Sequence, residues 1–144
     1  MDKDGAGADE SLLDAVDATG SEPLREAIAL GDRAAIIGFD WEFALEALEK
    51  VEEEAVELRE VLERRDPDPE QVLSEIGDLL FAACMVARKA GVDPALALGS
   101  TNAKFRRRFS YIERGLAAAG IDPDDATLDE MEELWQASKH QEHS

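Results

Sequence analysis

The apolar residues between positions 45 and 62 recur at the spacing of an α-helix, and no segment of the chain alternates with the period of a β-strand. Successive members of this stripe are separated by 3, 3, 4, 3 and 4 residues: Leu45, Leu48, Val51, Ala55, Leu58 and Leu62. A helix with one apolar stripe has to bury that stripe, and without strands only other helices are available as partners. The pattern therefore predicts an all-α fold.

Proline, glycine and capping residues divide the chain into helices. The strongest break is the run Asp66-Pro67-Asp68-Pro69, because each proline disfavours helical geometry in the residue before it. Gly91 with Asp93-Pro94 marks the next boundary, and Thr127 with Glu130 forms a capping box for the last helix. We therefore expect helices over residues 23–37, 41–64, 69–90, 94–119 and 128–139.

Single residues add detail to these helices. Ser21 and Asp40 are suitable N-caps for the first and second helices, and Gly99-Ser100 is a point where the fourth helix can kink or divide. A short helix is expected at residues 11–18. The connections are short, so consecutive helices are expected to pack as antiparallel neighbours.

The chain of 144 residues is expected to contain one domain and one leader. Residues 1–22 carry seven acids among small residues, which predicts a flexible acidic leader, and residues 23–144 form the helical domain. Residues 76–87 are apolar nearly all round, as in a buried helix. A single small chain cannot cover such a helix completely, which predicts a homodimer or a dimer of dimers.

The charge of the chain excludes several classes of function. There are 34 acidic and 15 basic side chains, a formal net charge of −19. Nucleic acids and anionic membranes are bound through an excess of Lys and Arg, so we expect neither as a partner. The single Cys84 cannot form an internal disulfide, which fits a cytoplasmic location. His140 and His143 lie in the last five residues, so the chemistry inside the fold is left to acids.

Acidic residues of the second predicted helix lie beside its apolar stripe. Glu54, Glu57 and Lys50 fall within about 60° of one another at the edge of the stripe, whereas Glu53 lies further round. On this helix alone, a solvated charged face is the simpler interpretation.

The third predicted helix favours a functional interpretation. Asp78 is the single charge within the apolar segment 76–87, and Glu75 lies one turn before it on the same side. A buried carboxylate is costly unless it pairs with a cation or binds a metal. A structural ion pair with Lys or Arg is the alternative for Asp78.

The two pairs of carboxylates lie at similar distances from the Asp-Pro-Asp-Pro turn. Glu57 precedes the end of its helix by about 10 Å of rise, and Glu75 follows the start of the next by about 9 Å. When the helices fold back at the turn, Glu54, Glu57, Glu75 and Asp78 can converge. Four carboxylates without His or Cys suit a hard cation, Mg²⁺ or Mn²⁺.

A cation held by carboxylates commonly serves phosphate chemistry, which also needs basic side chains. In the run Lys104-Phe105-Arg106-Arg107-Arg108, Lys104 and Arg108 share one face of the fourth helix. We expect these two to face phosphates, while Arg106 and Arg107 can instead pair with surface acids.

The same residues carry a resemblance to a known family, whose signature is Glu-Glu-x-x-Glu followed by Glu-x-x-Asp. This chain has Glu53-Glu54-Ala55-Val56-Glu57 and Glu75-Ile76-Gly77-Asp78. Over about residues 24–140 it resembles the MazG family of all-α nucleoside triphosphate pyrophosphohydrolases. Further matching blocks, in the same order, are Gly38-Phe39-Asp40-Trp41, Lys50-Val51, Gly77-Asp78-Leu79-Leu80-Phe81-Ala82, Asn102-Ala103-Lys104-Phe105, Arg107-Arg108-Phe109 and Met131-Glu132-Glu133-Leu134-Trp135.

The resemblance implies a four-helix-bundle-like fold with an extra C-terminal helix, assembling as a dimer. It implies Mg²⁺-dependent hydrolysis of NTPs and dNTPs to the monophosphate and pyrophosphate, a house-cleaning of the nucleotide pool. Residues 23–144 would be the catalytic domain, similar to the C-terminal one of the two domains in longer family members. The implied catalytic acids are Glu53 and Glu54, the implied metal ligands Glu54, Glu57, Glu75 and Asp78, and the implied nucleotide contacts Lys50, Lys104, Arg108, Trp135 and Lys139.

Two other functions also fit the sequence. A relative with a narrower substrate, dUTPase-like or a phosphoribosyl-ATP pyrophosphohydrolase, would share the carboxylates. A non-catalytic helical dimerisation module would use the acids for solubility only. Trp135 can stack on a base or belong to the core, and Trp41 and Cys84 are expected in packing roles.

Overall fold

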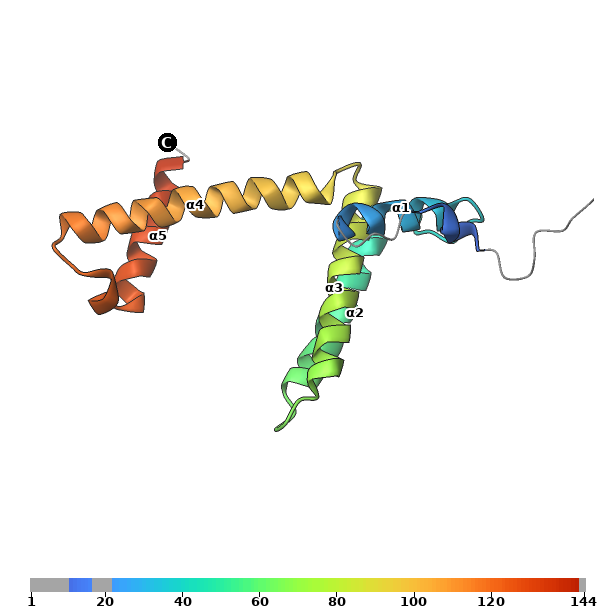
Figure 1. The fold of residues 1–144 in the computed structure, drawn as a ribbon, viewed down its shortest axis with the longest axis horizontal. Coiled ribbons are helices and arrows are strands. Elements are labelled where there is room, and N and C mark those ends of the chain that lie inside the picture. The colour runs from blue at the N-terminus through green and yellow to red at the C-terminus, as the bar shows by residue number, and fades with distance from the viewer. Residues whose placement is uncertain (1–10, 17–21, 143–144) are drawn as a thin grey trace, which may run out of the picture. The chain divides into compact units, whose positions relative to one another are not determined.

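The computed structural model describes residues 11–16 and 22–142, and no strand occurs among them, which confirms the predicted all-α class (Figure 1). In chain order the elements are η1 (Leu12–Ala15), α1 (Pro23–Ala35), α2 (Ala44–Leu62), α3 (Pro69–Lys89), α4 (Pro94–Ala118), η2 (Pro123–Asp125) and α5 (Leu128–Glu142). The chain divides into two compact units, Met1–Leu96 and Ala97–Ser144. None of the described helices is both long and apolar enough to cross a bilayer.

Helices α2 and α3 pack together as a hairpin within the first unit (Figure 1). The turn between them contains the predicted proline break, and the Asp68 side chain caps α3 by accepting a hydrogen bond of 3.0 Å from the Glu70 backbone N–H. Helix α1 packs on α3, and η1 packs on α1. The hairpin brings residues of α2 and α3 that are equally far from the turn to the same level.

The core of the first unit is small. Its buried members are Ala27, Ala47, Cys84 and Met85, with Trp41 packed partly buried against them. Burial raises the pKa of the Cys84 thiol, so this side chain serves as a small apolar group. Gly31 lets α1 approach α3 closely, because an added Cβ would lie 2.6 Å from Arg88 Nε and 2.7 Å from Met85 Sδ.

The start of the second helix differs from the prediction. Helix α2 begins at Ala44 rather than Trp41, and Asp40 does not cap it. Asp40 instead forms ion pairs with Arg88 and Lys89 at the end of α3. Two cations from another helix thus replace the local capping interaction that the sequence suggests.

The region before α2 also differs in detail. Helix α1 ends at Ala35 rather than at residue 37, and the chain turns through Gly38, whose φ is +86°. The predicted cap Ser21 lies outside the described residues, and Glu22 precedes α1 without a side-chain capping bond. The short helix predicted at 11–18 is a 3₁₀ turn, η1, while residues 17 and 18 lie outside the described part.

Helix α4 runs from Pro94 to Ala118 and is not divided at Gly99-Ser100, where the sequence allows a kink or a division, because one glycine in a helix interior costs only about 1 kcal/mol. In the second unit α5 packs closely on α4, since a Cβ added to Gly115 would lie 2.5 Å from Leu134 Cδ2.

The predicted capping box of α5 is confirmed. The Glu130 backbone N–H donates to Thr127 Oγ1 at 3.1 Å, and the Thr127 N–H donates to Glu130 Oε1 at 3.2 Å.

Within the described part of this single chain, helix α3 is not buried on all sides, as expected for an apolar helix that one small chain cannot cover completely. Leu73 is 75% exposed and Leu80 is 54% exposed, because α1 and α2 cover only part of the α3 surface. Large apolar side chains gathered on one helix in this way usually mark a contact surface.

Candidate functional site

Three of the four predicted metal ligands come together on the α2–α3 hairpin. One carboxylate oxygen from each of Glu54, Glu57 and Glu75 lies within 4.8 Å of the other two. Glu54 and Glu57 are one turn apart on α2, and Glu75 reaches them from α3. The register set by the proline turn therefore brings acids that are 18 and 21 residues apart into one group.

The group contains buried oxygens that lack hydrogen-bond partners. Glu54 is only 7% exposed, and the Oε2 atoms of Glu54 and Glu75 are buried without a partner among the described residues. Leaving a buried acceptor unsatisfied costs about 1–3 kcal/mol, and more when the group is charged. The arrangement is thus unfavourable by itself and suits a bound cation.

Lys50 supplies the positive charge next to this group. Its Nζ lies 3.3 Å from Glu54 Oε1 and 3.2 Å from Glu53 Oε2. Hydrogen bonds to Glu53 and Glu54, with their charges, raise the pKa of Lys50, so the ammonium form is favoured. One lysine facing four carboxylates leaves the group with an excess of negative charge.

The crowding of acids also affects Glu57. Hydrogen bonding to Glu54 and the charge of Glu54 raise the pKa of Glu57, and Glu75 acts in the same direction. A carboxyl whose ionisation is opposed by its neighbours gains most from a divalent cation placed between them.

Two of the predicted acids stay at the edge of the group. Asp78 is exposed on α3, one turn beyond Glu75, and lies outside the set of three. The Glu53 side chain is 64% exposed and contacts Lys50. The structure thus joins Glu54, Glu57, Glu75, Lys50 and Glu53 into one cluster and places Asp78 beside it.

The other predicted nucleotide contacts belong to the second unit. Arg108 lies over the Trp135 ring, with Cζ 5.3 Å from the ring centroid, and forms an ion pair of 2.8 Å with Glu142. Phe105 tilts against Trp135 with a centroid separation of 5.6 Å. Trp135 is half-buried, and Lys104 and Lys139 are also partly exposed.

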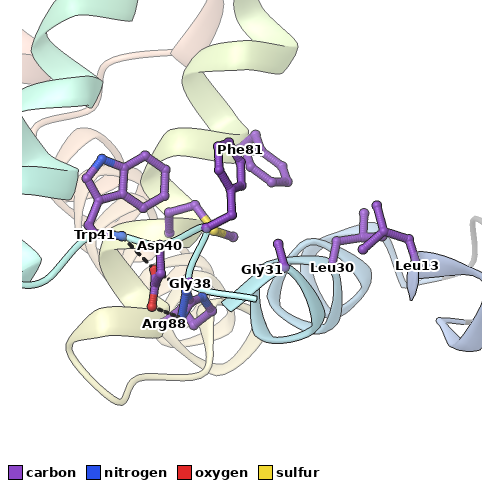
Figure 2. A pocket seen from close by; sticks show the side chains of 11 residues that line it. Leu13, Leu30, Gly31, Gly38, Asp40, Trp41, Phe81 and Arg88 are labelled. Atoms are coloured by element: carbon purple, nitrogen blue, oxygen red, sulfur yellow. Dashed lines mark hydrogen bonds and ion pairs between the residues drawn. The ribbon is translucent and has the colours of Figure 1, made fainter. Parts of the chain in front are cut away.

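The first unit also holds an apolar cavity that sequence reasoning missed. It has a volume of about 500 Å³ and lies between η1, α1, the loop before α2, and α3 (Figure 2). Trp41 and Phe81 contribute rings to its wall, and Leu13 and Leu30 contribute aliphatic side chains. No sequence pattern points to this cavity, although the family-matching block Gly38-Phe39-Asp40-Trp41 lines it; of these residues only Trp41 is expected in a packing role.

Charged residues fix the loop that borders this cavity. Asp40 accepts hydrogen bonds from both Arg88 Nη groups (Figure 2). Lys89 Nζ lies 3.1 Å from Asp40 Oδ2. Although burial alone raises the pKa of Asp40, the Lys89 hydrogen bond and the Arg88 charge hold it below the usual range. The loop is therefore held on α3 by a carboxylate that stays ionised at neutral pH.

Comparison with known proteins agrees with the two-part carboxylate motif. Residues 39–105 match the family model of phosphoribosyl-ATP pyrophosphohydrolase, which covers both halves of the motif. A protein of Escherichia coli K12 named nucleoside triphosphate pyrophosphohydrolase is 39% identical over 119 residues, 83% of this chain and 45% of the relative. The Thermotoga maritima protein named nucleoside triphosphate pyrophosphohydrolase/pyrophosphatase MazG is 33% identical over 121 residues, 81% of this chain and 46% of the relative.

A third relative shares a shorter segment. The uncharacterized protein YabN of Bacillus subtilis is 43% identical over 76 residues, 53% of this chain and 16% of that protein. The chain spans less than half the length of each of these relatives. Because the similarity extends over most of this chain and includes the carboxylate motif, the comparisons support a place for the chain in the MazG family.

Proposed function

We propose that this chain is a Mg²⁺-dependent pyrophosphohydrolase that converts NTPs and dNTPs to the monophosphate and pyrophosphate. The observation that carries the proposal is the group of Glu54, Glu57 and Glu75, with two buried carboxylate oxygens that lack partners. The names of the Escherichia coli and Thermotoga relatives support the reaction type.

The residues fit a hard divalent cation. Every donor of the group is a carboxylate oxygen, and no His or Cys belongs to it, which favours Mg²⁺ or Mn²⁺ over zinc. Glu54, Glu57 and Glu75 would hold the ion, and Asp78, one turn away, is the fourth ligand that the family motif implies. When bound, such an ion polarises phosphate oxygens and activates water.

The remaining residues of the cluster have separate tasks in the proposed reaction. Water attacks the α-phosphorus, the bond between this phosphorus and the bridging oxygen breaks, and pyrophosphate leaves with that oxygen. Glu53 is an exposed acid at the edge of the cluster, and we propose that its carboxylate accepts the proton of the attacking water. Lys50 contributes positive charge against the growing charge of the phosphates.

The base and the outer phosphates need further contacts. The cavity of the first unit lies along α3 from the carboxylates, because Phe81 is about 9 Å of helix rise beyond Glu75. Its apolar walls and the Trp41 ring suit the flat face of a nucleobase. Lys104, Arg108, Trp135 and Lys139 of the second unit keep the nucleotide-contacting roles that the family motif implies.

A second candidate is favoured by a specific observation. The model matching residues 39–105 is that of phosphoribosyl-ATP pyrophosphohydrolase, which performs the same cleavage on a larger substrate. The two candidates share the carboxylate group and differ only in the substrate.

The assembly we propose is a homodimer that buries the apolar α3 surface around Leu73 and Leu80 and completes a four-helix bundle. A dimer of dimers is a further arrangement of the same kind. We place the enzyme in the cytoplasm, acting on free nucleotides, with no nucleic acid or membrane as partner.

Pyrophosphate release from a panel of NTPs, dNTPs and phosphoribosyl-ATP, with and without Mg²⁺, tests the proposal. We expect Mg²⁺-dependent release from nucleoside triphosphates. Release from phosphoribosyl-ATP alone selects the second candidate, and no release from any compound supports the non-catalytic module.

A further inference from the structure

Arg108 is held from two directions within the second unit. Its Nε and Nη2 groups donate to the same oxygen of Glu142, Oε2, at 3.1 and 2.8 Å. Its guanidinium also lies over the Trp135 ring, 5.3 Å from the centroid. The Arg108 side chain is only 12% exposed, although it carries a full charge. A long side chain held in this way has lost most of its rotamer freedom before any ligand arrives.

The geometry of α5 explains how one helix supplies both contacts. Trp135 and Glu142 are seven residues apart, which places them within about 20° on one helical face. Phe105, one turn before Arg108 on α4, tilts against the same tryptophan at 5.6 Å. The Trp135 ring is thereby packed on one side, so it forms a fixed support for the guanidinium.

The contact with Glu142 leaves part of the guanidinium available. A guanidinium has five N–H groups, and Glu142 engages the edge formed by Nε and Nη2. The Nη1 group forms no hydrogen bond with any residue of the described part of the chain. The edge formed by Nη1 and the outer N–H of Nη2 can therefore donate to a phosphate while Glu142 keeps the other edge.

Neighbouring arginines are not held in this way. Arg106 and Arg107 are exposed, and neither forms an ion pair with a described residue. Within the basic run, Arg108 therefore differs from Arg106 and Arg107, because it binds the carboxylate of Glu142, 34 residues later in the sequence.

We propose that Glu142 is a positioning residue that orients Arg108 toward the phosphates of the nucleotide. The proposal rests on the proposed function, because it takes a polyphosphate as the group that Arg108 binds. Glu142 itself does not touch the substrate in this scheme. Its carboxylate fixes the guanidinium so that less freedom is lost when the phosphate binds.

The test combines Glu142→Gln with Arg108→Ala in a double-mutant cycle, measured as kcat and KM for a dNTP and as tripolyphosphate affinity by calorimetry. Glu142→Gln keeps the shape of the side chain and removes its charge. We expect kcat/KM to fall by about 3- to 10-fold, mainly through KM, with a similar loss of tripolyphosphate affinity. In the Arg108→Ala background, Glu142→Gln should have no further effect.

Glu133→Gln is the matched control, because Glu133 is exposed on the opposite face of α5 and its substitution removes the same charge. Kinetics within about two-fold of the unmodified chain are expected for it. Thermal unfolding of both variants shows whether they fold.

Three outcomes would overturn the inference. A Glu142→Gln variant with equal or higher kcat/KM means that Glu142 is neutral or competes with the phosphates. An equal loss in the presence and absence of Arg108 means that Glu142 acts independently of the arginine. An unmodified chain that neither cleaves nucleotides nor binds tripolyphosphate removes the proposed function as well, whereas the first two outcomes leave that function intact.

Discussion

Replacing Glu54 with glutamine should increase the stability of the metal-free protein and nearly abolish its activity. Glu54 is 7% exposed, and its Oε2 is buried without a partner. Glu57 and Glu75 each bring a carboxylate oxygen within 4.8 Å of it. The amide of glutamine has no charge and can donate a hydrogen bond to either neighbour, so both unfavourable features are relieved.

The expected size of the effect follows from the buried oxygen. Satisfying or removing one buried unpaired acceptor contributes about 1–2 kcal/mol, which corresponds to a rise in Tm of roughly 3–8 °C for a chain of this size. The loss of the Lys50 ion pair opposes this gain, but the Lys50 side chain is 41% exposed, so solvent screens its charge and reduces the contribution of the pair. Turnover should fall by about 100-fold or more, because a metal ligand is lost.

The assay is thermal unfolding with and without MgCl₂, together with pyrophosphate release. Mg²⁺ should raise the Tm of the unmodified protein, because it binds only the folded state, and should have little effect on the variant. Glu52→Gln is the control, since Glu52 is exposed on the other side of α2 and loses the same charge. A Glu54→Gln variant that is less stable without metal, or that keeps the Mg²⁺ response, would refute the reasoning.

Four further predictions follow from other parts of the structure. Arg108→Ala should lose about 2–4 kcal/mol of transition-state stabilisation, measured from kcat/KM, while Arg106→Ala should lose little, because of the two only Arg108 is held in place. Equal losses would indicate that the two arginines act through a general positive electrostatic potential rather than at a specific site. Gly31→Ala should reduce the free energy of unfolding in urea by about 1–3 kcal/mol, because the added Cβ meets Arg88 and Met85; an unchanged midpoint would contradict the close approach of α1. Asp40→Asn should lower the free energy of unfolding at pH 7. The difference in unfolding free energy between the variant and the unmodified protein should shrink as the pH falls below about 4, since a carboxyl with a lowered pKa stabilises the fold only while it is ionised. A constant difference across this range would argue against the ion pairs of Asp40. Light scattering at micromolar concentration should give a dimer, and Leu73→Glu should dissociate it; a monomeric unmodified chain would exclude the α3 interface.

Features set by neighbouring residues were predictable from the sequence. Asp68 and the pair of Thr127 and Glu130 cap their helices as expected, because a cap involves residues only two or three positions apart. The convergence of Glu57 and Glu75 was also predictable, since a hairpin with a fixed turn places residues at equal distance from the turn side by side.

Features that depend on distant residues were not predictable. Asp40 was expected to cap α2, but Arg88, 48 residues later, binds it. The cavity beside Trp41 is formed by four segments, and no single segment shows a pattern for it. The pairing of Arg108 with Glu142 joins two helices across 34 residues, although the spacing of Trp135 and Glu142 on one face of α5 is visible in the sequence.

The most direct test of the proposed chemistry is ³¹P NMR of the products formed from one dNTP by the unmodified protein, first in EDTA and then after addition of Mg²⁺. We expect no reaction in EDTA, and equimolar deoxynucleoside monophosphate and pyrophosphate once Mg²⁺ is added. Reaction in EDTA would contradict the role of the carboxylate group as a metal site, and release of orthophosphate with a diphosphate would contradict attack at the α-phosphorus.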